Sequence, residues 1–300
     1  MASIFGALFG TQNALNYGAK LLNSISIKEI AALTRQDAEA QIRARVQNVP
    51  MGNDLILTRV LGHPKMFLHT NDLGFSAHVM LDGYWEIWLT QILAKLITPG
   101  MVVVDVGANF GYYTVLAASC VWPDGKVIAI EPNPPVAAVM EKTIQLNGFQ
   151  DIVHIEKVAA TSTNEGECHL YVPFGEPKNA SIVEAGSNFP GGETISVPMR
   201  TIDSLCSHFD RVDLVKIDAE GAEIAVIEGM LETIKRFKPI IALEFNAARY
   251  SDAKSFLEQL TAYYGDPKLI DFYGKPKEIS HGDLLLENIN QDKLLLFGVR

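Results

Sequence analysis

The segment MVVVDVGANFGYYTVLAASC, residues 101–120, constrains the fold of this chain more than any other. Its β-branched run from Met101 to Val104 is typical of a parallel strand that is covered on both faces. Gly107 and Gly111 then permit a tight turn, and the residues that follow have helical spacing. A strand that turns through glycines into a helix predicts a site for a small ligand at that turn.

Strands and helices alternate along much of the remaining chain. The predicted strands, beside 101–106, are 126–131, 152–157, 212–217 and 240–245, with weaker ones at 268–272 and 293–299. The predicted helices are 111–120, 134–147, 222–236 and 252–263. This alternation predicts an α/β fold with a mostly parallel, doubly wound sheet, which binds its ligand outside the carboxyl ends of the strands.

Two regions depart from that alternation. Residues 1–80 are predicted to form a helical N-terminal extension that ends in a short hairpin, from the runs LILTRVLG and KMFLHT, before a main domain at 81–300. Apolar residues near the N-terminus follow a helical spacing, which predicts docking on the body or on a second subunit in a homo-oligomer. The region 165–200 has a polar loop between two strand-like runs, and predicts an inserted hairpin lying over the site.

Composition disfavours several classes of partner. The 300 residues carry a formal net charge of -10 without a lysine or arginine cluster, so nucleic acid is a poor candidate. Cys120, Cys168 and Cys206 lack the spacing of metal ligands, so no metal site is predicted. Scattered thiols suit a reducing compartment, and the N-terminus resembles neither a signal peptide nor a transmembrane segment. We therefore expect a cytoplasmic protein.

The spacing of the glycine turn indicates the kind of ligand. A dinucleotide fingerprint, G-x-G-x-x-G, places its second glycine where a pyrophosphate approaches, but this chain has Ala108 and Asn109 there. Asp105 at the end of the strand instead favours a ligand with a positive charge or an amino group, as S-adenosylmethionine has. Glu131 ends the next strand in VIAIEPNP, where a carboxylate accepts hydrogen bonds from ribose hydroxyls. NAD shares the ribose, so the alternative of an NAD-dependent oxidoreductase stays open.

A third block, VDLVKIDAEGAEIAVIEGM at 212–230, gathers charges at the end of a buried strand. Burying charges is costly unless they are paired, so Lys216 is predicted to hold one of the neighbouring carboxylates ionised. Asp218 and Glu220 are predicted to be functional. Glu223 is predicted to be structural, because a carboxylate near a helix N-terminus interacts favourably with the helix dipole.

These three blocks, VVVDVGANFGYYT, VIAIEPNP and the longer TIDSLCSHFDRVDLVKIDAEGAEIAVIEGM followed by PIIALEFN, resemble the FkbM family of S-adenosylmethionine-dependent methyltransferases over roughly residues 80–246. The resemblance implies a Rossmann-like class I methyltransferase fold, with a seven-stranded sheet whose last strand is antiparallel. It also implies O-methylation of a hydroxyl on a sugar, polysaccharide or other secondary metabolite, with S-adenosylhomocysteine as the second product.

The resemblance assigns roles by position. Residues of the glycine turn would line the methionine part of the donor, Glu131 the ribose and Asn133 the neighbourhood of the adenosine. Glu86 matches a family glutamate, and Asn179 and Ser181 in KNASIV match an Asn-and-Ser motif that would contact the acceptor. The full set of predicted donor-binding residues is Glu86, Asp105, Gly107, Ala108, Asn109, Gly111, Tyr112, Glu131, Pro132, Asn133, Ala159 and Asp218.

Methyl transfer to a hydroxyl benefits from a general base. Asp218, Glu220 and Glu244 follow predicted strands at their carboxyl ends, so each is a candidate for that role, with Lys216 as their charged partner. These oxygens are also the kind that bind divalent cations, although their positions do not demand a metal. A further alternative is a catalytically silent scaffold that binds the donor.

Overall fold

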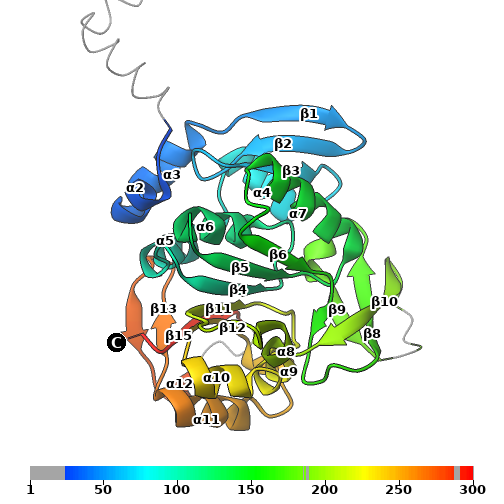
Figure 1. Cartoon of the computed structure of the whole chain (residues 1–300), viewed down its shortest axis with the longest axis vertical. Helices are drawn as coiled ribbons and strands as arrows, with labels where there is room; N and C mark the ends of the chain where they lie inside the picture. The colour runs from blue at the N-terminus through cyan, green and yellow to red at the C-terminus, as the bar shows by residue number, and fades with distance from the viewer. Residues whose placement is uncertain (1–23, 185, 187–188, 287–290, 300) are drawn as a thin grey trace, which may run out of the picture.

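The computed structural model describes residues 24–184, 186, 189–286 and 291–299 (Figure 1). Its centre is a sheet of eight strands in the order β14-β13-β15-β12-β11-β4-β5-β6. The strands are β4 (Val102–Val106), β5 (Lys126–Ile130), β6 (Val153–Glu156), β11 (Leu214–Ile217), β12 (Ile240–Phe245), β13 (Lys268–Ile270), β14 (Pro276–Glu278) and β15 (Lys293–Phe297). All strands predicted for the main domain are present.

The five strands from β6 to β12 run parallel, and β15 lies antiparallel between β12 and β13. The antiparallel last strand is as predicted, but the count of seven is wrong, because β14 adds an eighth strand at the edge. A tight turn makes this strand: the Asp271 carboxylate accepts hydrogen bonds from the amides of Tyr273 and Lys275. A three-residue exposed strand that begins with Pro276 gives no readable alternation in the sequence.

Helices cover both faces of the sheet (Figure 1). The helices in the main domain are α5 (Ile87–Leu96), α6 (Tyr112–Val121), α7 (Pro134–Leu146), α8 (Ile202–Cys206), α9 (Glu223–Glu228), α10 (Leu231–Phe237), η3 (Ala247–Arg249), α11 (Ala253–Tyr264) and α12 (His281–Leu286). Side chains of β4 alternate between the two layers: Val103 packs with α5 to α7, whereas Val102 and Val104 pack with α8 to α12. This double coverage explains the continuous apolar run in the sequence.

The helix predicted at 222–236 is two helices, α9 and α10. They separate at Gly229, where an added Cβ would lie 2.0 Å from the carbonyl oxygen of Thr161. The carbonyl of Gly229 also accepts a hydrogen bond from the amide of Asp203, whose carboxylate in turn receives the amides of Glu232 and Thr233. Asp203 therefore caps α10 from a distant segment, which the sequence pattern did not reveal.

The described part of the N-terminal extension contains α2 (Ile27–Ala32), α3 (Arg35–Arg43), β1 (Asn48–Gly52), β2 (Leu55–Arg59), β3 (Lys65–His69) and α4 (Phe75–Asp82). The predicted hairpin is β2 and β3, but β1 extends it to three antiparallel strands. All five residues of β1 are exposed, so its sequence lacks the alternation of a half-buried strand. The apolar residues predicted to dock on the body or on a second subunit, which run from Ile4 to Leu22, all lie outside the described residues.

The extension packs against α5, α6 and α7, the helices that cover one face of the main sheet. Ile30, Ile42 and Leu68 belong to the same buried cluster as Val103 and Leu116. Backbone amides of β3 also donate to side chains of α7. The extension therefore completes the core on the α5 to α7 side of the sheet.

The insertion predicted at 165–200 forms a second small sheet, drawn in light green in Figure 1. Its elements are β7 (Ala159–Ala160), β8 (Glu167–Pro173), η2 (Pro177–Asn179), β9 (Ser181–Val183) and β10 (Gly192–Arg200), with strand order β7-β10-β8-β9. The predicted hairpin is β8 and β10, and β9 is an additional strand that the polar composition of the loop concealed. The loop of the insertion, which contains η2 and β9, is therefore part of this small sheet.

Candidate active site

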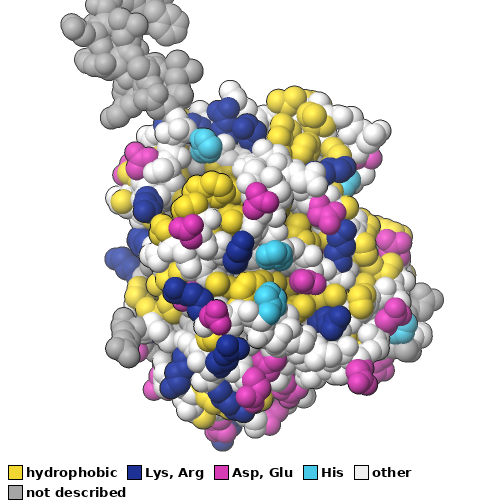
Figure 2. Space-filling model, in the orientation of Figure 1, with side chains coloured by type: hydrophobic (Ala, Val, Ile, Leu, Met, Phe, Trp, Pro, Cys, Tyr) yellow, Lys and Arg dark blue, Asp and Glu magenta, His cyan; other side chains and the backbone are white. Residues whose placement is uncertain are grey.

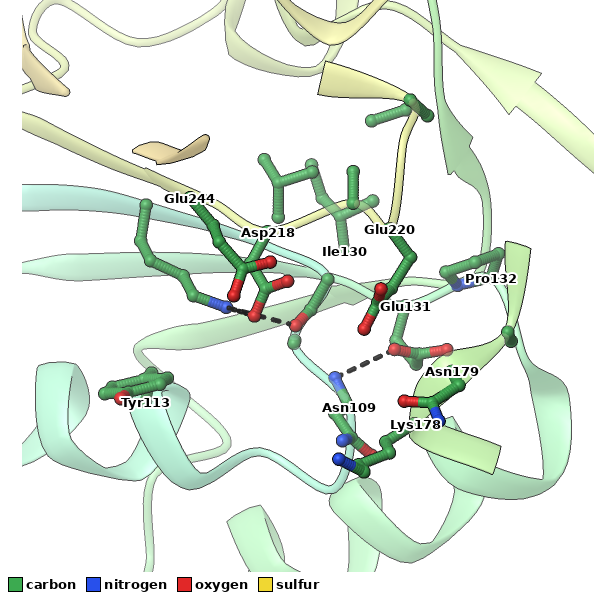
Figure 3. Close-up of a pocket in the computed structure, with 18 of the residues that line it drawn as sticks. Asn109, Tyr113, Ile130, Glu131, Pro132, Lys178, Asn179, Asp218, Glu220 and Glu244 are labelled. Carbon is green, nitrogen blue, oxygen red and sulfur yellow. Dashed lines mark hydrogen bonds and ion pairs between the residues drawn. The ribbon is translucent and has the colours of Figure 1, made fainter. Parts of the chain in front are cut away.

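A cavity of about 520 Å³ opens where the carboxyl ends of the parallel strands meet (Figure 3). Its walls come from three parts of the chain: the segment before α5, the turns that follow the sheet strands, and the insertion. The predicted site residues that line it are Glu86, Gly107, Ala108, Asn109, Tyr112, Glu131, Pro132, Ala159, Asn179, Lys216, Asp218, Glu220 and Glu244. The fold thus brings together predicted site residues that are up to nearly 160 positions apart in the sequence.

Four predicted site residues do not line the cavity. Asp105 is buried below the turn, because strand alternation points its side chain toward α6, where it accepts a hydrogen bond from Thr114 at 2.7 Å. Gly111 serves packing, since an added Cβ would lie 2.7 Å from Cγ of Met140. Asn133 is the N-cap residue of α7, and Ser181 pairs with Tyr171 in the insertion.

The glycine turn lies against the end of β11. Gly107 has a φ of +72°, and an added Cβ there would lie 1.8 Å from the carbonyl oxygen of Asp218, so only glycine fits. Asn109 also has a positive φ, of 52°, and its side chain lines the cavity at the position where a dinucleotide fingerprint has glycine. The side chain of Asn109 therefore occupies space that the glycine of a dinucleotide fingerprint leaves open for a pyrophosphate.

Glu131 is held by the backbone on both sides of its carboxylate. Its Oε2 accepts a hydrogen bond from the amide of Asn109 at 2.8 Å (Figure 3), and its Oε1 accepts one from the amide of Asn133 at 2.8 Å. Each oxygen keeps a lone pair for a ligand hydroxyl, as vicinal ribose hydroxyls require. Burial raises the pKa of Glu131 to about 7, although both amides lower it.

Lys216 lines the cavity and lies between two carboxylates. Its Nζ is 3.1 Å from Oδ2 of Asp218 and 3.8 Å from Oδ1 of Asp105, and its side chain is almost fully buried. Burial alone would lower the pKa of Lys216, but these carboxylates raise it above its ordinary value. The predicted pairing of Lys216 is confirmed, and it explains how a lysine is buried in a central strand.

The three candidate bases differ in protonation. Burial and the charge of Asp218 raise the pKa of Glu244 to about 10, so Glu244 is protonated at neutral pH and donates a hydrogen bond to Asp218. Burial would raise the pKa of Asp218, but Lys216 and this hydrogen bond lower it below its ordinary value. Burial, followed by the charge of Asp218, raises the pKa of Glu220 to about 7. Of the three, only Glu220 titrates near neutral pH.

Arg249 is a site residue that the sequence analysis missed. Its guanidinium lies 3.3 Å from Glu220, 3.2 Å from Glu244 and 3.1 Å from Asp292. It belongs to η3, in the irregular turn after β12, where no periodicity draws attention to it. The only available signal was a basic residue soon after a strand that ends in glutamate.

Glu223 has the structural role predicted for it. Its carboxylate is fully buried and accepts the amides of Ala219 and Gly221 together with the hydroxyl of Tyr250. These bonds fix the turn after β11, in which Glu220 has a φ of 49°. A glutamate held in the left-handed region is strained, which is common at functional sites.

Glu86 enters the cavity from the segment before α5. It accepts a hydrogen bond of 2.7 Å from the hydroxyl of Tyr113, and burial raises its pKa above the ordinary value. Trp85 and Phe75 from the same segment, and Lys178 from the insertion, also line the cavity and were not predicted. Their contribution depends on long-range packing that sequence spacing does not encode.

Neither a metal cluster nor a membrane span is found in the part of the chain that the structure describes. Its His, Cys, Asp and Glu side chains form no group of three arranged to hold a metal ion. None of its helices has the length and apolar character to cross a membrane. On the face drawn in Figure 2, lysine and arginine side chains are dispersed among acidic ones rather than gathered into one basic patch.

The parallel sheet, its antiparallel last strand, the glycine turn and the acidic residue after β5 define the Rossmann-like class I methyltransferase fold. The model of the methyltransferase FkbM domain matches residues 105–266, more than half of the chain. The chain belongs to this family. The cavity described above lies largely within the matched region.

Several known proteins are similar to parts of this chain. The 2-O-methyltransferase NoeI of Sinorhizobium fredii (strain NBRC 101917 / NGR234) is 28% identical over 57% of this chain and 71% of its own length. Methyltransferase sdnD of Sordaria araneosa is 25% identical over 43% of this chain. The transmembrane O-methyltransferase of Propithecus coquereli is 33% identical over 37% of this chain. This chain spans 60% and 40% of the lengths of the last two relatives.

Among solved structures, a methyltransferase FkbM from Methylobacillus flagellatus KT aligns with a TM-score of 0.42 and 15% identity, covering 73% of this chain and 52% of that one.

Proposed function

We propose that this protein transfers a methyl group from S-adenosylmethionine to a hydroxyl oxygen of a sugar-containing acceptor. The observation that carries the proposal is Glu220, a carboxylate with a pKa of about 7 that faces the same cavity as the doubly held Glu131. Family membership supports methyl transfer, and the name of the relative NoeI, a 2-O-methyltransferase, supports oxygen as the acceptor atom. The polar side chains around Glu220, those of Asp218, Glu244 and Arg249, suit an acceptor rich in hydroxyls.

The cavity residues fit the donor. Glu131 would accept hydrogen bonds from the ribose hydroxyls, and Glu86 would face the amino group of the methionine moiety. Gly107 lets the backbone approach the ligand closely. Asp105 has a supporting role: it holds Lys216 below the turn instead of touching the donor.

The chain supplies alignment and proton removal. When bound, S-adenosylmethionine supplies an electrophilic methyl group on sulfur. Glu220 accepts the proton of the acceptor hydroxyl as that oxygen forms its bond to the methyl carbon, and the electrons of the breaking carbon–sulfur bond stay with sulfur in S-adenosylhomocysteine. Arg249 keeps Glu220 oriented, while Asp218 pairs with Lys216 and accepts a hydrogen bond from the protonated Glu244.

The direct test combines binding with turnover. Isothermal titration should show binding of S-adenosylmethionine and S-adenosylhomocysteine, and not of NADH, and a labelled-methyl assay should yield a methylated sugar product identified by mass spectrometry. Failure to bind either sulfur ligand would contradict the proposal. Binding of NADH alone would favour the oxidoreductase, whereas donor binding without transfer to any sugar acceptor would favour the silent scaffold.

Replacing Glu131 with glutamine is expected to weaken S-adenosylhomocysteine binding at least about tenfold, because a carboxylate that accepts charge-assisted hydrogen bonds is lost. Since the ionised form accepts these bonds, wild-type affinity should fall as the pH drops below about 7, the pKa of Glu131. Titration calorimetry from pH 5.5 to 8.5 measures both effects. The variant should lose this pH dependence, and equal affinity in the two proteins would remove Glu131 from the ribose site.

Glu244→Gln is expected to leave kcat and donor Kd within about threefold of wild type, because a protonated carboxyl and an amide both donate a hydrogen bond to Asp218. The proton on Glu244 leaves only near pH 10, so the two proteins should behave alike between pH 6 and pH 9. Steady-state kinetics with labelled donor would show this. A hundredfold loss of kcat in Glu244→Gln would instead identify Glu244 as the base.

A further inference from the structure

Lys178 is a cation in the cavity that the proposed chemistry leaves unused. It belongs to η2 of the insertion, and its Nζ lies 5.5 Å from the centroid of the Trp85 ring. Its methylenes pack on Gly74, where an added Cβ would lie 2.6 Å from Cε of Lys178. Both contacts hold the ammonium group at the cavity wall.

The cations of the cavity differ in their partners. Lys216 pairs with two carboxylates, and Arg249 lies within 3.3 Å of the acidic side chains of Glu220, Glu244 and Asp292. Among the described residues, no carboxylate forms an ion pair with Lys178; its contact is the face of Trp85. An ammonium group held in this way, at a partly buried position, is available to an anionic group of a ligand.

Glu86 supplies a nearby charge of opposite sign. It directly follows Trp85, over which Lys178 lies, and the charge of Lys178 is among the influences that lower the pKa of Glu86 against the larger effect of burial. The two side chains do not form an ion pair, although both line the cavity. An α-amino acid carries its ammonium and carboxylate groups on one carbon, so it needs two oppositely charged partners of this kind.

We propose that Lys178 binds the α-carboxylate of the methionine moiety of S-adenosylmethionine, opposite Glu86 at the α-ammonium group; this inference rests on the proposed function. Figure 3 shows Lys178 entering the cavity on the opposite side from Glu220, Asp218 and Glu244, and therefore away from the carboxylates that surround the acceptor hydroxyl. The insertion thus contributes to the donor site. This role is additional to the predicted one, in which the insertion lies over the site.

A pair of ligands isolates the carboxylate. Decarboxylated S-adenosylmethionine keeps the sulfonium, ribose and amino groups and lacks only the carboxylate. Titration calorimetry should show that wild type binds S-adenosylmethionine about tenfold more tightly than the decarboxylated ligand. Lys178→Met keeps the apolar stem on Gly74 and Trp85, and is expected to lose about tenfold in affinity for S-adenosylmethionine and less than about twofold for the decarboxylated ligand.

Two further variants control for charge and for folding. Lys178→Arg should retain the preference for the carboxylate, and Lys254→Met, on the exposed helix α11, should bind both ligands as wild type does. Thermal unfolding should be unchanged in all three variants.

Equal losses for both ligands in Lys178→Met would overturn the proposal. So would unchanged donor affinity with a raised acceptor KM, which would assign the ammonium to an anionic acceptor instead. Failure of the proposed function is distinguishable: without a donor site wild type would bind neither ligand, and a silent scaffold would bind the donor but transfer no methyl group in the labelled-methyl assay.

Discussion

Glu220→Gln is expected to lower kcat by about a hundredfold or more while changing the Kd for S-adenosylmethionine by less than about threefold. The amide keeps the shape of the side chain near Arg249 but cannot accept the proton of the acceptor hydroxyl. Single-turnover kinetics with labelled donor, together with titration calorimetry, separates the two parameters.

The pH profile gives the same prediction a second measurement. The deprotonated carboxylate is the base, so the single-turnover rate of wild type should rise with pH through about 7, the pKa of Glu220, and level off above it. Saturating donor removes the pH dependence of donor binding that comes from Glu131. Glu220→Gln should lack this rise. Glu228→Gln, an exposed residue at the end of the helix that follows, is the matched control and should resemble wild type. A Glu220→Gln variant that loses donor binding would show that Glu220 is not the base but part of the donor site.

Lys216→Met is expected to lower the free energy of unfolding by about 3 kcal/mol or more, since removing one member of a buried ion pair leaves the other charges without compensation. Asp105 has no hydrogen-bond partner for its Oδ1 among the described residues and depends on Lys216 for that oxygen. Denaturation by urea measures the loss. The exposed Lys254→Met is the control, and is expected to unfold as wild type does.

A second substitution tests the cause of that loss. In the double variant Lys216→Met/Asp105→Asn, a neutral amide replaces one of the carboxylates that lost its partner. The double variant should therefore recover part of the lost stability. The raised pKa of Lys216 means that its stabilising contribution is complete below the ordinary lysine value of 10.5, so the comparison holds across pH 6 to 9. A single variant within about 1 kcal/mol of wild type would show that Lys216 is not required to compensate these carboxylates.

Local patterns predicted the main sheet well. Continuous apolar runs in the parallel strands reflect burial on both faces, and Gly107 occurs where only glycine fits against Asp218. The extra strands β1, β9 and β14 were not predicted because they lie at sheet edges, where exposure removes the alternation that marks a half-buried strand. Arg249 and Lys178 were not predicted either, because they lie in irregular segments that have no periodic pattern.

Predicting the residue types of the site was easier than predicting their roles. Asp105, Asp218, Glu220 and Glu244 were all identified as acidic residues near strand ends. Their roles differ because of their burial and their distances to Lys216 and Arg249, which the strand pattern does not specify. Protonation depends on burial and on these neighbours together, so no local pattern contains it.

The sequence alone determined the order of strands and helices, the glycine turn and the acidic residue after the second sheet strand, because each is encoded by neighbouring residues. Only the tertiary structure decided that Asp105 supports the site from below, that Glu220 is the one of the three candidate bases whose pKa is raised to about 7, and that the insertion brings Lys178 to the cavity. The physical reason is the same in each case. The free energy of a charge depends on its distances to other charges and on its burial, and burial at this site comes from segments that are far apart in the chain.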